Sequence, residues 1–153
     1  MQTFRPTNWL VPPLLMFVAE NGKYPAGLAE DSYDFSGEGV VDLPGTPGEK
    51  FEQEIEVPKA GLYALRYTYA NGNGPINTDN KCAIRTIYVN GKPVGKVILP
   101  QTGDWVNWRE TNSVWVQLPA GKATVSLVFT PEDENMNMEV NQAHVDYLTL
   151  YPY

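Results

Sequence analysis

Short runs of β-forming residues, each ended by turn residues, recur along the chain and constrain its fold more than any other feature. The clearest run is Leu62–Tyr69, in which every second residue is apolar. Alternation with a period of two places one set of side chains on one face of a pleated strand. No segment carries an apolar stripe with the 3.6-residue period of a helix. The pattern therefore predicts an all-β protein.

Turn signals every roughly 8–12 residues are typical of a β-sandwich or barrel. We predict an antiparallel β-sandwich of about nine strands, a jelly roll. Asn90-Gly91 is a strong hairpin signal, because a type I′ turn needs a positive φ at both central residues. The predicted strands are Leu14–Ala19, Gly39–Leu43, Phe51–Val57, Leu62–Tyr69, Ile84–Val89, Val94–Leu99, Ser113–Leu118, Thr124–Phe129 and Ala143–Leu150.

The chain of 153 residues fits one domain with a hydrophobic core. Residues 1–13 show no periodicity and are predicted to form an N-terminal strap or linker before a domain spanning residues 14–153. Trp9–Phe17 is apolar, but Pro12-Pro13 interrupts the run. The sequence contains no apolar run of the length that a transmembrane helix needs, and no membrane partner is expected.

Charge and reactive residues exclude several classes of protein. The net charge of −7, without any Lys/Arg cluster, argues against nucleic-acid binding. The single cysteine, Cys82, rules out an internal disulfide and a cysteine-based zinc site. One histidine and no G-x-S-x-G motif leave little for a nucleophilic triad. The chain has enough Asp and Glu residues to supply the carboxylate pair of a glycoside hydrolase, so residue types alone do not exclude this activity. We nevertheless expect binding rather than catalysis.

The loops combine aromatic side chains with amides, which suits carbohydrate binding. Sugar rings offer flat C–H faces to aromatic rings and hydroxyl groups to amides. In a sandwich the loops gather at the two ends, so the loops after Tyr69, before Trp105 and before Ala143 are predicted to meet at one rim. Each Asn has the alternative role of capping a turn. The candidate ligand residues are Tyr69, Asn71, Asn73, Asn80, Arg85, Trp105, Trp108, Asn137, Asn141 and His144.

Two carboxylates suggest a metal site. Glu20 ends the first predicted strand and Asp146 lies in the last. If these strands pair, the two carboxylates would bind a hard cation such as Ca²⁺, with backbone carbonyls completing the shell. Two ordinary surface acids are the alternative.

Several segments, taken in order, resemble carbohydrate-binding modules of family 35, which are close relatives of family 6. The resemblance runs from about Phe17 to Leu150. The segments are Ala19-Glu20, FSGEGVVDL, VPKAGLYALRYTYANGNG, IYVNGKPVG, TGDWVNW, LPAGKATVSL and HVDYLTL.

The resemblance implies a non-catalytic β-sandwich joined, in the same parent chain, to the catalytic domain of a secreted or cell-surface bacterial enzyme that acts on glycans. It implies a structural Ca²⁺ held by Glu20 and Asp146. It also implies ligand contacts from Tyr69, Asn71 and one of Trp105 and Trp108. The glycan itself is left open.

Two departures from the family pattern stand out. His144 occupies the position of a ligand-binding Asn, and Val40 replaces an aromatic residue. Both changes support the alternative of a structural or protein-interaction domain that has lost sugar binding. Lys81 and Arg85 suggest pairing with an acidic sugar, because Arg binds carboxylates in a bidentate manner. Alternatively, Lys81 and Arg85 lie on the outer face of a sheet and do not contact a ligand.

Overall fold

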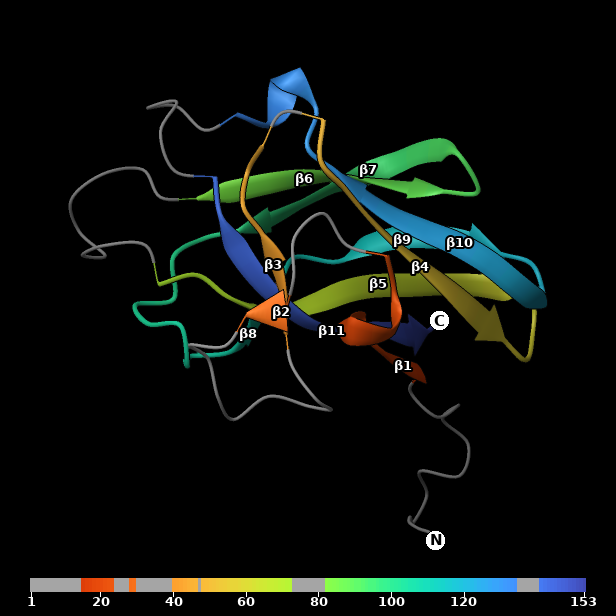
Figure 1. Cartoon of the computed structure of the whole chain (residues 1–153). Coiled ribbons are helices and arrows are strands. Elements are labelled where there is room, and N and C mark those ends of the chain that lie inside the picture. Colours follow the sequence, from red (N-terminus) through yellow and green to blue (C-terminus); the bar gives the residue numbers. More distant parts are fainter. Residues whose placement is uncertain (1–14, 24–27, 30–39, 47, 73–81, 135–140) are drawn as a thin grey trace, which may run out of the picture.

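A computed structural model gives the fold, and it describes residues 15–23, 28–29, 40–46, 48–72, 82–134 and 141–153. The domain is built almost entirely of strands (Figure 1). The strands are β1 (Leu15–Val18), β2 (Leu28–Ala29), β3 (Val40–Leu43), β4 (Lys50–Val57), β5 (Gly61–Ala70), β6 (Ala83–Val89), β7 (Lys92–Leu99), β8 (Arg109–Glu110), β9 (Val114–Leu118), β10 (Gly121–Val128) and β11 (Ala143–Pro152). Two single-turn 3-10 helices, η2 (Ala19–Asn21) and η3 (Pro131–Asp133), lie in the connections.

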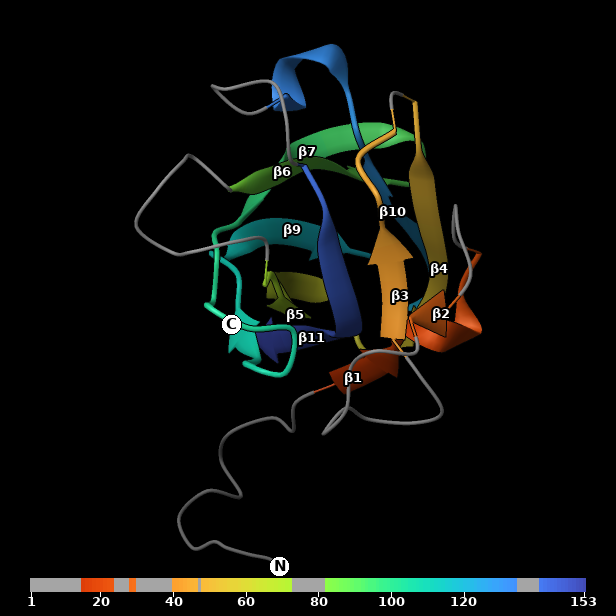
Figure 2. The ribbon, with the colours of Figure 1, turned by 60° about the vertical axis from the view of Figure 1, so that its left-hand side comes forward.

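The strands form two antiparallel sheets. Sheet A has the order β2-β3-β11-β5-β8, with β1 added beside β11 and β9 beside β5. Sheet B has the order β4-β10-β6-β7. Figure 2 shows the two sheets as separate layers, with β3 beside β11 in one and β4 beside β10 in the other. The prediction of an all-β sandwich is confirmed, whereas its description as a jelly roll stays a prediction.

All nine predicted strands are present, with bounds that differ by a few residues. Within the described ranges, β2 and β8 are additional two-residue strands that lie outside the nine predicted strands. The Asn90-Gly91 turn is also confirmed, because the φ angles are 50° at Asn90 and 85° at Gly91. The N-terminal segment 1–13 lies outside the described residues.

The core fills the space between the two sheets, as period-two alternation requires. Tyr63, Leu65, Tyr67 and Tyr69 of β5 all face it and are nearly or completely buried. In β4 the apolar residues are buried, while Glu54 and Glu56 are exposed. The outer face of this strand is therefore acidic. No helix in the part of the chain that the structure describes is long and apolar enough to cross a membrane.

Candidate functional site

The candidate site begins at the first residues of β11, where β3 and β5 flank this strand. His144 lies opposite Asp42 of β3 on one side and opposite Ala70 of β5 on the other. Val145, the next residue, pairs with Val41 and Tyr69 and faces the core. Because successive side chains of a strand point to opposite faces, His144 and Asp42 lie on the outer face of sheet A.

The loop between β7 and β8 brings an aromatic ring onto this outer face. The rings of Trp105 and His144 have centroids 4.2 Å apart and are tilted by 33°. Trp105 is half-buried, whereas His144 is only 3% exposed. The indole therefore belongs to the surface, and the imidazole lies in the layer beneath it.

Backbone contacts hold this loop against the end of β5. The Thr102 N–H donates to the Asn71 carbonyl oxygen at 2.8 Å, and the Asn71 N–H donates to Thr102 Oγ1 at 3.1 Å. Gly72 touches the loop so closely that a Cβ atom there would lie 2.6 Å from the Trp105 nitrogen and 2.7 Å from its Cδ1. A glycine is thus required where the backbone passes Trp105.

Polar groups lie beside His144. His144 Nε2 lies 3.6 Å from Asp42 Oδ1, and the same oxygen accepts a hydrogen bond of 2.8 Å from Gln142 Nε2. An aromatic face bordered by carboxylate and amide groups is an arrangement that suits sugars, since each ring has an apolar face and a hydroxyl rim.

Two predicted ligand residues are placed in the interior, and this corrects the expectation of direct contact. Tyr69 is 2% exposed, and its hydroxyl donates to the Pro100 carbonyl oxygen at 2.8 Å. Burial raises the pKa of Tyr69 to about 12. Asn71 is fully buried and donates from Nδ2 to the Leu99 carbonyl oxygen at 3.0 Å. Both side chains fix the loop between β7 and β8 rather than offering a surface to ligand.

Arg85 is a third correction, because its guanidinium is fully buried. It lies neither at a ligand site nor on an outer sheet face. Nε donates to Glu49 Oε2 at 2.9 Å, and Nη2 donates to the Asn141 carbonyl oxygen at 2.7 Å. Burial lowers the pKa of Arg85, and the charge of Glu49 opposes that shift. A group enclosed in this way cannot bind a sugar carboxylate.

The remaining candidates fall into two groups. Asn141 is 6% exposed beside β11, and Trp108 is half-buried in the same loop as Trp105. Asn73, Asn80 and Asn137 lie outside the described residues, as does Lys81. The structure therefore brings Trp105 and His144 together, and it leaves the amide contribution of the long loops as a prediction.

Asp42 and Gln142 were missed by sequence reasoning. Alternation in Val41-Asp42-Leu43 does indicate that Asp42 points away from the core. Its pairing with His144 depends on the register between β3 and β11, strands that are far apart in the sequence. The sequence contains no local signal for that register.

The backbone brings the two candidate metal ligands to one place. β1 pairs with β11, and Val18 lies opposite Tyr147. Helix η2, which contains Glu20, follows β1 directly and packs on β11. Asp146 is 2% exposed and lies where the pairing of β11 with β5 shifts by one residue, which marks a β-bulge.

The residue types found where η2 packs on β11 are those that bind a hard cation. A buried carboxylate beside the backbone carbonyls of a tight turn is a typical part of a Ca²⁺ site. The side chain of Glu20 is not among the described atoms. Among the described residues, no three His, Cys, Asp or Glu form a group that could hold a metal by themselves.

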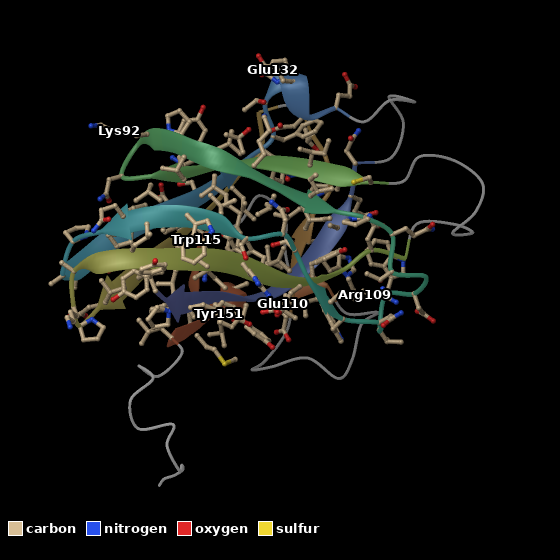
Figure 3. The ribbon with its side chains drawn as sticks, turned by 180° about the vertical axis from the view of Figure 1, so that it is seen from behind. Lys92, Arg109, Glu110, Trp115, Glu132 and Tyr151 are labelled. Carbon is tan, nitrogen blue, oxygen red and sulfur yellow. The ribbon has the colours of Figure 1, made fainter. Side chains whose placement is uncertain are left out.

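Further along the same outer face lies a second group of exposed side chains, seen from behind in Figure 3. Trp115 of β9 is 53% exposed, and its ring meets that of Tyr153 edge to face, with centroids 5.8 Å apart. Arg66 donates to Glu110 at 3.1 Å, and its guanidinium lies 4.9 Å from the centre of the Tyr151 ring. Trp115 pairs with Ala64, six residues along β5 from Ala70, so it lies roughly 20 Å from His144.

Comparison with known proteins identifies the family. The model of the family described as "Carbohydrate binding module (family 6)" matches residues 30–150. A family 35 carbohydrate-binding module from Clostridium thermocellum has the same fold, with a TM-score of 0.73 and 25% identity, over 93% of this chain and 100% of that one. A cycloisomaltooligosaccharide glucanotransferase from Paenibacillus sp., complexed with cycloisomaltoheptaose, contains a domain of this fold; the TM-score is 0.74 at 24% identity, over 88% of this chain and 18% of that one.

Curated relatives are much longer proteins. A cycloisomaltooligosaccharide glucanotransferase from Niallia circulans is 29% identical over 116 residues, which cover 76% of this chain and 11% of the relative. A 1,6-alpha-glucosyltransferase from Sporosarcina globispora is 30% identical over 129 residues, which cover 77% of this chain and 10% of the relative. The chain thus spans about a tenth of these relatives. Because the family 6 model matches most of its length, this chain belongs to the carbohydrate-binding modules related to family 6, and it shares its fold with family 35 modules.

Proposed function

We propose that this domain is a non-catalytic module that binds carbohydrate at the outer face of sheet A, where Trp105 covers His144. One observation carries the proposal: a half-buried indole packs over His144 at the loop end of the sheet, and the carboxylate of Asp42, bonded to the amide of Gln142, lies beside that imidazole. In its parent protein the module would direct an attached, glycan-active catalytic domain to its polysaccharide. Secretion or exposure on a bacterial cell surface is part of the same proposal.

The names of the relatives suggest which glycans to test first. One relative is a 1,6-alpha-glucosyltransferase, another is a cycloisomaltooligosaccharide glucanotransferase, and one of the similar structures holds cycloisomaltoheptaose. Dextran and isomaltooligosaccharides are therefore the first probes. Mannan and chitosan follow, because a mannan endo-1,4-beta-mannosidase and an exo-beta-D-glucosaminidase are also relatives.

The test is affinity electrophoresis of the isolated domain in gels that contain each polysaccharide, followed by calorimetry on the one that binds. A shallow, solvent-open site should give a dissociation constant between about 1 μM and about 1 mM. Replacement of Trp105 by Ala should weaken binding about tenfold or more, whereas W115A, which removes an exposed indole elsewhere on the same face, should not. Retention of full affinity in W105A would contradict the site, and no binding to any probe would contradict the function.

Calcium is the structural cofactor in this proposal. The buried carboxylate of Asp146 and the position of Glu20 directly after β1 support it. Added Ca²⁺ should raise the midpoint of thermal unfolding of EDTA-treated protein, because a ligand that binds only the folded state stabilises it. The response should disappear in D146N. Equal midpoints with Ca²⁺ and with EDTA would contradict a calcium site.

A structural or protein-interaction role is the alternative. The burial of Tyr69, Asn71 and Arg85 favours this alternative, because these three residues were expected to contact the ligand and instead lie in the interior of the domain. A domain of this kind would bind none of the polysaccharides. Turnover of a glycan by the isolated domain would instead show that it is an enzyme.

A further inference from the structure

His144 is held in a position from which it supports another side chain better than it reaches a ligand. The residue is 3% exposed, and the indole of Trp105 lies over the imidazole with 4.2 Å between the ring centres. A ring with so little exposed surface has little room for a hydrogen bond to a sugar hydroxyl. The face that a ligand would meet first belongs to Trp105.

Both rings are fixed by neighbours on different elements. Trp105 packs against the backbone of Gly72, which leaves no space for even one added carbon atom between them. His144 is flanked by Asp42, whose Oδ1 lies 3.6 Å from Nε2 and also accepts a hydrogen bond from Gln142. The imidazole thus forms a flat floor between β3 and β5, and the indole is held between that floor and the glycine.

We propose that His144 is a positioning residue, whose aromatic ring holds the indole of Trp105 in the orientation that packs against carbohydrate. The proposal rests on the proposed function and adds the role of a residue that does not itself bind the sugar. Two aromatic rings in contact attract each other, and here the ring centroids lie 4.2 Å apart with the rings tilted by 33°. The requirement at position 144 is accordingly a flat ring and not a hydrogen-bonding group.

That distinction can be tested with three substitutions. H144A removes the ring, H144N keeps a polar side chain without an aromatic ring, and H144F keeps a ring without hydrogen-bonding atoms. If His144 supports Trp105, H144A and H144N should both weaken binding to dextran about three- to tenfold, and H144F should restore most of the lost affinity. If His144 instead bonds to the sugar, H144N should retain affinity and H144F should lose it, which would overturn the proposal.

A measurement without ligand separates this proposal from the proposed function. In a variant with Trp9, Trp108 and Trp115 replaced by Phe, Trp105 is the sole tryptophan. Acrylamide should quench its fluorescence about twofold more strongly when H144A or H144N is added, whereas H144F should leave the quenching near its original value. Thermal unfolding of each variant, measured in parallel, shows whether the fold is intact.

The quenching and binding measurements separate the two proposals. Equal quenching in all of the variants would show that His144 does not hold Trp105 and would overturn the positioning role. If the quenching follows the expected order while the unsubstituted domain binds no polysaccharide, the packing role of His144 is supported and the proposed function fails.

Discussion

Arg85 and Glu49 form an ion pair that is closed off from solvent: Nε lies 2.9 Å from Oε2, and the two side chains are 0% and 1% exposed. The other carboxylate oxygen of Glu49 accepts hydrogen bonds from the backbone N–H groups of Gly45 and Thr46. Arg85 also reaches the carbonyl oxygens of Leu43 and Asn141. The pair therefore ties β6 to the turn between β3 and β4 and to the residues just before β11.

The first prediction is that R85A destabilises the domain severely. Removal of one partner leaves the buried carboxylate of Glu49 without its counter-charge, and such a loss costs about 3–5 kcal/mol. R85K should also be destabilising, because one ammonium group cannot make the forked contacts of a guanidinium. The free energy of unfolding in urea is the measurement.

Arg66 gives the matched control. Its pair with Glu110 is partly exposed, at 39% and 34% for the two side chains. A solvent-accessible ion pair is worth at most about 1 kcal/mol, and the hydrogen bond from Arg66 Nε to Ser113 Oγ adds about 1 kcal/mol, so R66A should lower the free energy of unfolding by no more than about 2 kcal/mol. Equal losses in R85A and R66A would show that the buried pair is not a structural anchor.

A second prediction concerns the stability of the domain at acidic pH and its dependence on Asp133, the last residue of η3. Its carboxylate is buried and accepts hydrogen bonds from Thr86 at 2.9 Å, from the Thr130 N–H at 3.0 Å and from Lys96. Burial alone would raise the pKa of this carboxyl, but the hydrogen bonds from Lys96, Thr130 and Thr86 outweigh burial and lower it.

A lowered pKa in the folded state fixes the sign of the pH dependence. The ionised carboxylate contributes stability that is fully present above the unfolded pKa of about 3.9 and is lost as the pH falls through the lower folded value. D133N should therefore be less stable than the unsubstituted domain at pH 7, and the gap should narrow below about pH 4. Unfolding in urea across this range is the measurement, with E134Q, which removes an exposed carboxylate next to it, as control. A gap that stays constant with pH would contradict the prediction.

Local pattern predicted most of the fold, because alternation marks each of the longer strands. All nine predicted strands are present, but β2 and β8 were not foreseen. A two-residue strand exists because a neighbouring strand pairs with it, and such pairing leaves no pattern in its own sequence.

The alternation of core-facing and outward-facing residues also indicates that two of the predicted ligand residues are buried. Tyr69 lies an even number of residues from Tyr63, Leu65 and Tyr67 along β5. Its side chain therefore points to the same face of the strand, which is the face that packs in the core. Arg85 likewise lies two residues from Ile87 in β6, so both side chains point to the same face of the strand, and Ile87 is completely buried. Residue type suggested ligand binding in both cases, and position in the strand was the stronger indicator. The packing of His144 under Trp105, by contrast, depends on a loop and a register that local sequence does not determine.

A third prediction compares two buried tyrosines of β5. The hydroxyl of Tyr69 donates to Pro100, whereas that of Tyr67 is buried without a hydrogen-bond partner among the described residues. Y69F should cost about 1 kcal/mol, because it leaves a carbonyl oxygen unpaired. Y67F removes a polar atom that already lacks a partner and should leave stability unchanged or raise it by about 1 kcal/mol. Thermal and urea unfolding of the two variants should fall in that order, and a larger loss in Y67F would show that its hydroxyl is bonded.

The last prediction tests the contact between Gly72 and the loop that carries Trp105. In G72A the new methyl group would lie 2.6 Å from the Trp105 backbone nitrogen and 2.7 Å from Cδ1, so the loop must move away from β5. The indole then shifts from its place over His144. We expect binding to dextran to weaken about tenfold, while the free energy of unfolding falls by no more than about 2 kcal/mol, because the strain is confined to a surface loop.

G61A is the matched control for this change. Gly61 begins β5 at the other end of the strand, and a Cβ atom there meets no atom within 4 Å. Its affinity for dextran should equal that of the unsubstituted domain. A weakened G72A beside an unchanged G61A would connect binding to the placement of Trp105. If G72A instead binds as tightly as G61A, the ligand does not depend on the indole that the structure places at this rim, and the site must be sought elsewhere on the domain.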